Sequence, residues 1–324
     1  MAGARIEVTR SFRAMNTDVQ IILLVEPSLA RRTAQRVLDA VARLFALVEA
    51  VVSRFRPDSE LSALNRSAGK PFAASPLLFA AVSAAVEAAR ATGGLFDPTV
   101  LPALVASGYD RSFELLGDVV MPDVPLPHGV TPGQWHHIHL DPRRRTITLP
   151  ADSGLDLGGI AKGWTVDYAV RLLAACGFRH YAIDAGGDLY VAGRQADGTP
   201  WPVGVEDPRA PGRDLVVLRL EDCAVATSST CRRRWQQDGS TRHHLIDPRT
   251  GRPAESGVLA ATVLASSVAR AEVLAKVALL LGPEEGLRFL ETQPDAAGLL
   301  VLERSAGMVR WPRTASLVME AHDA

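Results

Sequence analysis

The chain has little cysteine and almost no net charge. Its 324 residues include three cysteines, Cys176, Cys223 and Cys231, which are widely spaced and form no Cys-x-x-Cys pair. Such a set argues against a disulfide framework or a structural zinc site and favours a reducing compartment. With 35 basic and 36 acidic residues the net charge is −1, so no overall field attracts nucleic acid or an anionic membrane.

Long apolar runs are also absent. Residues 1–13 alternate polar and apolar side chains, and no continuous apolar stretch precedes Ile21, so this segment does not look like a secretory signal. No later window approaches the run of about 20 apolar residues that a membrane helix needs. We therefore expect a cytoplasmic protein without a membrane span.

The composition is that of an ordinary globular protein, with 47% hydrophobic and 22% charged residues. At this length we expect one large domain over 5–313, or two intimately packed halves, followed by a frayed tail over 314–324. Helical and strand periodicities alternate along the chain, which favours a mixed α+β fold.

Several elements can be placed from periodicity and capping residues. Residues 5–25 predict a strand or hairpin, residues 29–52 a long amphipathic helix, and Ser75-Pro76 the start of a second helix that ends at Gly93-Gly94. The segment Arg54–Ala68 between these helices is expected to be a loop, and the Pro-rich residues 118–135 a surface excursion. Further predictions are a hairpin over 137–149, short strands near 181–183, 189–192, 216–220, 262–265 and 298–303, and a helix over 269–281.

The segment 155–163 is the most informative stretch. A strand-like apolar entry leads into Gly158-Gly159 and Lys162, and Val166, Val170 and Leu173 then follow at helical spacing. A helix start presents free backbone N–H groups, and glycines allow a ligand to approach the backbone closely, so an anion such as a phosphate fits this turn. In isolation, an ordinary tight turn with a surface lysine is the more common explanation of such a segment, so the context has to decide.

Other short clusters allow the same two interpretations. They are Thr92–Thr99 after a helix, Ala185-Gly186-Gly187-Asp188 after a strand, Thr227-Ser228-Ser229 before three arginines, and His243–Gly251. Each alone fits a turn, a cap or a solvated basic face. Together they supply phosphate donors, an aromatic surface, a histidine and carboxylates, which are the parts of a nucleotide-handling site.

These motifs, in this order, resemble the ApbE family of flavin transferases over roughly residues 11–283. The matching segments are Met15-Asn16-Thr17, Ser53–Asn65 with Ser59-Glu60-Leu61, Gly94–Thr99, Asp156–Gly163, Gly186-Gly187-Asp188, Val203–Pro208 and His244–Gly251. Any one of them alone would be weak, but the ordered set is specific.

The resemblance implies an α+β fold with FAD in a cleft between two halves of the molecule, and transfer of FMN from FAD to a Ser or Thr hydroxyl of an acceptor protein. It assigns FAD contacts to Met15, Phe55, the Leu95-Phe96-Asp97 turn, and Gly158-Gly159 with Lys162 near the pyrophosphate. The remaining cofactor-binding positions are Trp164, Asp188, Thr227, Ser228, His244 and Ile246.

The chemistry requires a base and positive charge. The acceptor hydroxyl attacks the FMN-side phosphorus and AMP leaves, so a proton must be removed and phosphate charge stabilised. His244 is the candidate for the acid/base role, with Asp247 as a nearby carboxylate, while Lys162, backbone N–H groups and a cation serve the phosphates.

The chain departs from the family at the implied Mg²⁺ site. There the family has an Asp and a Thr on a late helix plus a backbone carbonyl at the position of Ala161, whereas this chain has Glu272 and Lys276. An ammonium group cannot ligate Mg²⁺. Either Lys276 replaces the metal with its own charge, which makes it a catalytic candidate, or it forms a helical ion pair with Glu272. Residues 227–231 also lack the family's acidic and aromatic positions.

Three functions remain open from the sequence. The first is FMN transfer to protein, the second is hydrolysis of FAD to FMN and AMP, and the third is FAD binding without turnover. All three use FAD, and none involves nucleic acid.

Overall fold

A computed structural model describes residues 5–26, 31–115, 133–237, 240–303, 308–310 and 318–321. The chain divides into two compact units, each assembled from separated segments. Unit 1 comprises Met1–Leu47, Lys162–Ser229 and Gly257–Ala324, and unit 2 comprises Val48–Ala161 and Thr230–Ser256. The expected excursion over 118–135 lies almost entirely outside the described residues.

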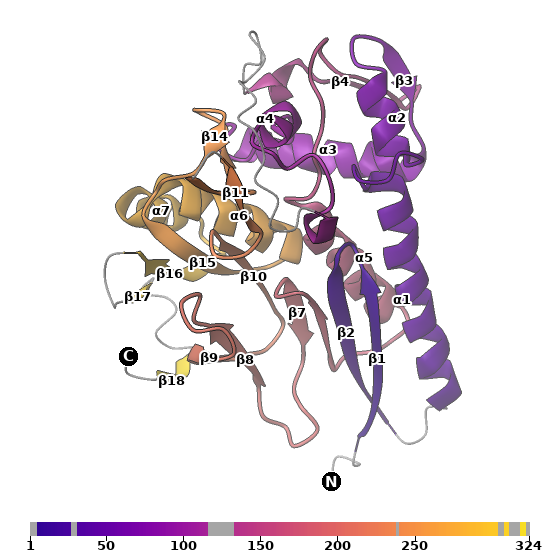
Figure 1. The fold of residues 1–324 in the computed structure, drawn as a ribbon. Helices are drawn as coiled ribbons and strands as arrows, with labels where there is room; N and C mark the ends of the chain where they lie inside the picture. Colours follow the sequence, from indigo (N-terminus) through magenta and orange to yellow (C-terminus); the bar gives the residue numbers. More distant parts are fainter. Residues whose placement is uncertain are drawn as a thin grey trace. The chain divides into compact units, whose positions relative to one another are not determined.

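Unit 1 contains an antiparallel sheet in the order β1-β2-β6-β7-β10-β15-β16-β17 (Figure 1). Its strands are β1 (Ile6–Ala14), β2 (Thr17–Val25), β6 (Tyr181–Ala185), β7 (Leu189–Ala192), β10 (Cys223–Ser229), β15 (Val258–Ala265), β16 (Ala297–Leu302) and β17 (Met308–Arg310). Val19 of β2 pairs with Ala185 of β6. This register brings the β1–β2 turn and the β6–β7 turn to the same end of the sheet.

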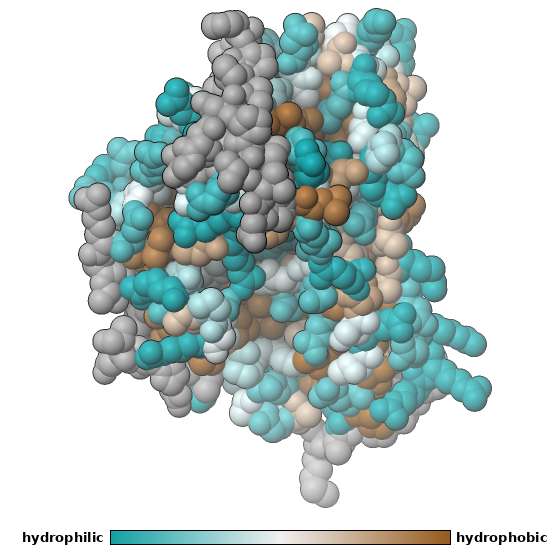
Figure 2. All heavy atoms as spheres, in the orientation of Figure 1, coloured by the Kyte–Doolittle hydropathy of each residue, from teal (hydrophilic) through white to brown (hydrophobic). Residues whose placement is uncertain are grey.

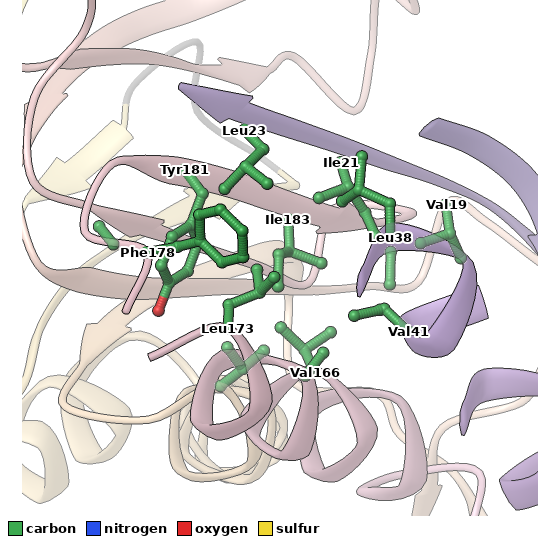
Figure 3. Packing of buried hydrophobic residues seen from close by; sticks show 14 of the residues in the cluster. Val19, Ile21, Leu23, Leu38, Val41, Val166, Leu173, Phe178, Tyr181 and Ile183 are labelled. Atoms are coloured by element: carbon green, nitrogen blue, oxygen red, sulfur yellow. The ribbon is translucent and has the colours of Figure 1, made fainter. Parts of the chain in front are cut away.

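Two helices supply the main core of unit 1. These are α1 (Arg31–Val52), whose last turns belong to unit 2, and α5 (Ala161–Ala175), which begins at the predicted Gly-Gly turn. Leu38 and Val41 of α1 and Leu173 of α5 are fully buried, as their helical spacing predicts. Figure 3 shows these side chains directed at Ile21 and Ile183 of the sheet.

The other elements of unit 1 include a helix pair, α6 (Val268–Leu281) and α7 (Pro283–Glu291), and a three-stranded sheet. The sheet has the order β18-β9-β8, formed by β18 (Val318–Ala321), β9 (Asp214–Leu220) and β8 (Trp201–Glu206). Residues 318–321 therefore pair with β9, in contrast to the frayed tail expected after residue 313.

Unit 2 has shorter elements. Its helices are α2 (Glu60–Arg66), α3 (Pro76–Ala91) and α4 (Leu101–Ala106), with 3₁₀ turns η1 (Phe113–Leu115) and η2 (Gln134–His137). Its strands are β3 (Pro71–Ala73), β4 (His139–Asp141), β5 (Thr146–Thr148), β11 (Arg234–Gln237), β12 (Ser240–His243), β13 (Ile246–Asp247) and β14 (Arg252–Pro253). They form three small antiparallel sheets, β3-β5-β4, β11-β12 and β13-β14.

The expected loop over 54–68 was wrong in part, because it contains α2. The buried Ser59 caps this helix by accepting a hydrogen bond from the Ser62 N–H at 3.0 Å. Both Glu60 oxygens accept hydrogen bonds from Ser75, the cap of α3. The Ser59-Glu60-Leu61 motif therefore holds two helices together, with Leu61 fully buried beneath it.

The strand-like entry at Leu155-Asp156-Leu157 is not a strand. The Leu155 N–H donates to the Asn65 side-chain oxygen at 2.8 Å, and the Asn65 amide donates back to the Leu155 carbonyl at 2.9 Å. An asparagine side chain thus takes the place of a neighbouring strand. The segment stays extended and buried without joining a sheet.

No helix in the described part of the chain is both long and apolar enough to cross a bilayer. Figure 2 shows one face on which hydrophilic residues predominate and hydrophobic residues are scattered.

Candidate functional site

Two family motifs meet at one end of the unit 1 sheet. The β1–β2 turn is formed by Met15 and Asn16, both with positive φ, at 53° and 58°. The β6–β7 turn carries Gly186, and a Cβ there would collide with the Thr17 hydroxyl. The Thr165 hydroxyl of α5 lies 3.7 Å from the Met15 sulfur. Met15, a predicted FAD contact, is therefore held in a strained turn beside α5.

The starts of α5 and α6 are locked together. A Cβ at Gly163 would lie 2.7 Å from the Ala269 nitrogen, so only glycine permits this approach. The Asp167 carboxylate accepts hydrogen bonds from Val268 N–H at 2.8 Å and Ala269 N–H at 3.0 Å, which satisfies free N–H groups at the start of α6. The register of the two helices is fixed by these contacts.

This register builds what we call the charged cluster: Lys162, Asp188 and Glu272. The Lys162 ammonium lies 2.5 Å from Asp188 Oδ2 and 2.9 Å from Glu272 Oε1. Glu272 Oε2 accepts the Gly163 N–H at 3.0 Å. Both carboxylates are at least 95% buried, at 3% and 4% exposure, so the lysine is the cation that makes their burial tolerable.

The two carboxyl groups differ in pKa although they share one ammonium. Burial raises the pKa of Asp188 to about 6, with Lys162 opposing and Glu272 adding to the shift. Burial also disfavours ionisation of Glu272, but Lys162, Lys276 and the Gly163 N–H outweigh it and hold its pKa below the ordinary value. Glu272 carries the firmer negative charge because it has the additional backbone donor.

The other predicted positions in unit 1 do not form a single surface. Thr227 is exposed on β10, and its hydroxyl lies 2.8 Å from that of Thr262 on β15. Ser228, the next residue, is buried, and neighbouring residues of a strand face opposite sides. Trp164 is buried on α5 and packs against Tyr168. Thr227 and Ser228 therefore cannot present their side chains to one ligand together.

Unit 2 contains an aromatic cluster of Arg54, Phe55, Tyr109, Trp235 and His244. The Arg54 guanidinium lies 4.0 Å from the Phe55 ring centroid and 4.6 Å from that of Tyr109. Tyr109 stacks on Trp235 at 5.4 Å, and His244 meets Tyr109 edge-on at 6.4 Å. Predicted flavin contacts, Phe55 and His244, are thus joined by residues that the motifs did not indicate.

Arg54 is almost entirely buried, with 5% of its side chain exposed. Its Nε lies 3.3 Å from Asp156 Oδ2, yet Nε and Nη2 have no hydrogen-bond partner among the described residues. Burial raises the pKa of Tyr109, while the positive charges of Arg233 and Arg54 act in the opposite direction. The cluster therefore combines buried, stacked rings with N–H donors that have no partner among the described residues.

His243 and His244 differ in their surroundings: His243 has a structural role, and His244 is accessible. His243 is buried between the Ala254 carbonyl, 2.9 Å from its Nε2, and the Leu245 N–H, 3.3 Å from its Nδ1. His244 is only half-buried. Asp247, the alternative acid/base residue, has both carboxylate oxygens paired with Arg249. Ile246 is buried in the core that contains Tyr109 and Trp235.

The predicted FAD contacts Leu95, Phe96 and Asp97 lie in one turn of unit 2, and Asp97 forms hydrogen bonds with the backbone around it. Asp97 Oδ1 accepts the Thr99 N–H at 2.8 Å, and Oδ2 accepts the Gly133 N–H at 2.8 Å. Phe96 is buried, whereas Leu95 is half-buried. This arrangement gives Asp97 a structural task, which is to shape the loop that carries Leu95.

The Gly158-Gly159 turn is organised by Asp156, whose Oδ1 accepts the Gly158 N–H at 2.6 Å. Its other oxygen, Oδ2, is the one paired with Arg54. Asp156 therefore links the aromatic cluster to the turn within unit 2. Gly158 is exposed and Gly159 half-buried, so the turn is open to a ligand. Ala161, at the start of α5, is buried.

Sequence reasoning missed Arg54, Tyr109 and Trp235. They come from three separate segments, and none has a periodic or motif signal that distinguishes it from a surface or core residue. Arg54 and Phe55 do lie inside a matched family segment. An Arg-aromatic pair there was the available hint.

Comparison with known proteins agrees with this geometry. A solved structure named as the flavin transferase ApbE from Vibrio cholerae superposes with a TM-score of 0.78 and 28% identity, covering 94% of this chain and 96% of that one. The fold is thus that of flavin transferases, α+β as expected.

Sequence relatives point to the same group. Curated proteins named FAD:protein FMN transferase from Vibrio cholerae and Treponema pallidum are each 32% identical to this chain, over 288 and 308 residues. They cover 88% and 86% of this chain, and 84% and 83% of their own length. The ApbE family model matches residues 15–300, and the chain belongs to the ApbE family.

Proposed function

We propose that this chain is an FAD:protein FMN transferase that moves FMN from FAD to a Ser or Thr hydroxyl of an acceptor protein and releases AMP. The relatives bearing this activity in their names match most of the chain. The observation that supports it best is the aromatic cluster, in which a buried guanidinium and two stacked rings adjoin His244.

The aromatic cluster suits a flavin ring. An isoalloxazine is flat and apolar on its faces and carries carbonyl oxygens on its edge. Phe55 and His244, the half-buried rings of the cluster, can contact such a ring, and the partnerless Nε and Nη2 donors of Arg54 match a carbonyl oxygen. Gly158 of the Gly158-Gly159 turn is exposed, so a pyrophosphate can approach the backbone closely next to the start of α5.

The reaction needs one proton to be moved. The acceptor oxygen forms a bond to the FMN-side phosphorus, the bond from that phosphorus to the bridging oxygen breaks, and AMP carries the electron pair away. His244 takes the hydroxyl proton, since it is half-buried and next to the cluster that holds the flavin. Asp247 is the weaker candidate, because Arg249 already binds both of its oxygens.

The test uses peptide libraries as acceptors. One library carries Ser or Thr at a central position and a matched library carries Ala there; each is incubated with FAD and the purified protein, and mass spectrometry and AMP release are measured. We expect the FMN mass on the Ser/Thr library alone, with an equal amount of AMP. His244→Gln should reduce the rate by roughly 10²-fold or more, whereas His139→Gln, at an exposed residue of β4, should not change it.

Two other outcomes would overturn the proposal. AMP release without FMN on either library would assign hydrolysis of FAD, with water as the acceptor. Bound and unchanged FAD would assign a binding protein without turnover.

A further inference from the structure

The charged cluster occupies the position where the family resemblance implies a divalent cation. Of the implied ligands, Glu272 has Oε1 paired with Lys162 and Oε2 bonded to the Gly163 N–H. The second implied side chain is an ammonium, Lys276. Mg²⁺ requires a near-octahedral shell of oxygen ligands at short distance, which this set does not supply.

The charges lead to the same conclusion. Asp188 and Glu272 bring two negative charges, and Lys162 and Lys276 bring two positive ones. Lys276 is half-buried, and its charge opposes the rise in pKa that burial causes at both carboxyl groups. The group is therefore already neutral, and a divalent ion would meet two ammonium groups. No cluster of three or more His, Cys, Asp or Glu side chains suited to a metal occurs among the described residues. The residues do not fit the metal.

The choice of basic residue is informative. Of 35 basic residues in the chain only three are lysines, Lys70, Lys162 and Lys276, and the other 32 are arginines. Two of the three lysines thus belong to this one group of charges. An ammonium is a compact point charge that can approach several oxygens, whereas a guanidinium is planar and broader.

We propose that this protein handles the FAD phosphates without a divalent cation and that Lys276, one helical turn after Glu272 on α6, supplies the positive charge that a metal would otherwise bring. The role of Lys276 rests on the proposed function, since FAD is the anion concerned. The mismatch between these residues and a metal does not depend on it. Lys162 is the member that keeps both buried carboxylates paired, so Lys276 is the one to alter.

The experiment measures the binding of Mn²⁺ and the binding of FAD to the whole chain. Mn²⁺ binding is followed by electron paramagnetic resonance, and FAD binding by fluorescence titration, once in EDTA and once in Mg²⁺. We expect no specific Mn²⁺ site and an FAD dissociation constant that is equal in the two conditions. A specific Mn²⁺ site in the wild type, or FAD affinity that depends on Mg²⁺, would overturn the proposal.

Variants separate the role of Lys276 from a loss of folding. Lys276→Gln should weaken FAD binding roughly tenfold or more, as expected for loss of a charged donor. Lys276→Arg should bind FAD more tightly than Lys276→Gln does, because it keeps the charge. Lys70→Gln, at the exposed third lysine, should bind FAD as the wild type does. Circular dichroism must show the wild-type fold in each variant. Unchanged affinity in folded Lys276→Gln would overturn the role of Lys276.

The double variant Glu272→Asp with Lys276→Thr recreates the side chains that the family uses. We expect it to gain a Mn²⁺ site that the wild type lacks. If it folds and still binds no Mn²⁺, the side chains at 272 and 276 are not what excludes the metal, and the proposal is wrong. If FAD binds to no form of the protein, the proposed function fails, while the Mn²⁺ measurements still decide the metal question.

Discussion

The charged cluster of unit 1 and the aromatic cluster of unit 2 solve the same physical problem in different ways. Each buries one cation. Lys162 is neutralised by two carboxylates at 2.5 and 2.9 Å, whereas Arg54 has one carboxylate at 3.3 Å and two aromatic ring faces. Oxygens around a point satisfy an ammonium, whereas stacking on rings covers the faces of a guanidinium and leaves its N–H donors to be satisfied separately.

The difference indicates what each region can offer a ligand. In the charged cluster, both carboxylates already bind Lys162. The cluster can therefore act on a ligand only through its charge. In the aromatic cluster the Nε and Nη2 donors of Arg54 have no hydrogen-bond partner among the described residues. The two clusters therefore differ in which of their polar groups remain without a partner.

The largest change in the free energy of unfolding is expected when the cation of the charged cluster is removed. Lys162→Met leaves Asp188 and Glu272 buried without their counter-ion, which should lower the free energy of unfolding by about 3–5 kcal/mol. Urea denaturation measures this, with Lys70→Met as the exposed control. A loss below about 1 kcal/mol would mean that the carboxylates do not depend on Lys162.

A smaller effect is expected at the cation of the aromatic cluster. Arg54→Lys keeps the charge but loses the planar stacking on Phe55 and Tyr109, and should cost about 2 kcal/mol in unfolding free energy. It should also weaken FAD binding, because the donors of Arg54 are lost. Arg56→Lys, two residues away and exposed, is the control. Equal stability of Arg54→Lys and wild type would show that charge alone matters here.

Trp235 allows a matched comparison between the units. Its indole N–H donates to the Ser107 carbonyl at 2.8 Å in unit 2, and that of Trp201 donates to the Ala192 carbonyl at 3.0 Å in unit 1. Each Trp→Phe change should cost about 1 kcal/mol of stability, from one lost buried hydrogen bond. Only Trp235→Phe should weaken FAD binding in fluorescence titrations. A similar loss in Trp201→Phe would contradict the assignment of the flavin to the aromatic cluster.

The smallest expected effect is the pH dependence of stability that arises from His243. Burial lowers the pKa of His243 from 6.5, Arg234 adds to the shift, and the Ala254 carbonyl and Glu255 oppose it. The unfolded chain therefore takes up this proton at a higher pH than the folded chain, so stability is complete above about pH 6.5 and falls as the pH drops below it. Urea midpoints for wild type and His243→Gln across this range provide the test. An equal slope in both would remove His243 as the cause.

Much of the fold could be predicted because its signals are local. The helix after Gly158-Gly159 follows from apolar spacing, and the hairpin over 5–25 from alternation. The short helix α2 was missed because seven residues carry little periodicity, although Ser59 is a typical cap. The Leu155 segment has a strand-like pattern but joins no sheet, because the Asn65 side chain bonds the Leu155 backbone, which no pattern shows.

The candidate site could be predicted only in part. Motifs indicated Lys162, Asp188 and Glu272, but the helical spacing of Glu272 and Lys276 suggested a pair within α6. In the structure Glu272 pairs with Lys162 of α5, because the glycine contact at Gly163 brings the two helices together. The stacking of Arg54, Tyr109 and Trp235 arises from tertiary packing between distant segments, so the sequence alone does not indicate it.

The most direct test of the account is the fate of the FMN half of FAD. The measurement is mass spectrometry of the Ser/Thr peptide library after incubation with FAD and the purified protein, in buffer containing Mg²⁺ so that no metal requirement can mask activity. The account predicts one FMN group added to Ser or Thr, with an equal amount of AMP released and no addition to the Ala library. AMP release without labelled peptide, or FAD that remains intact, would contradict it.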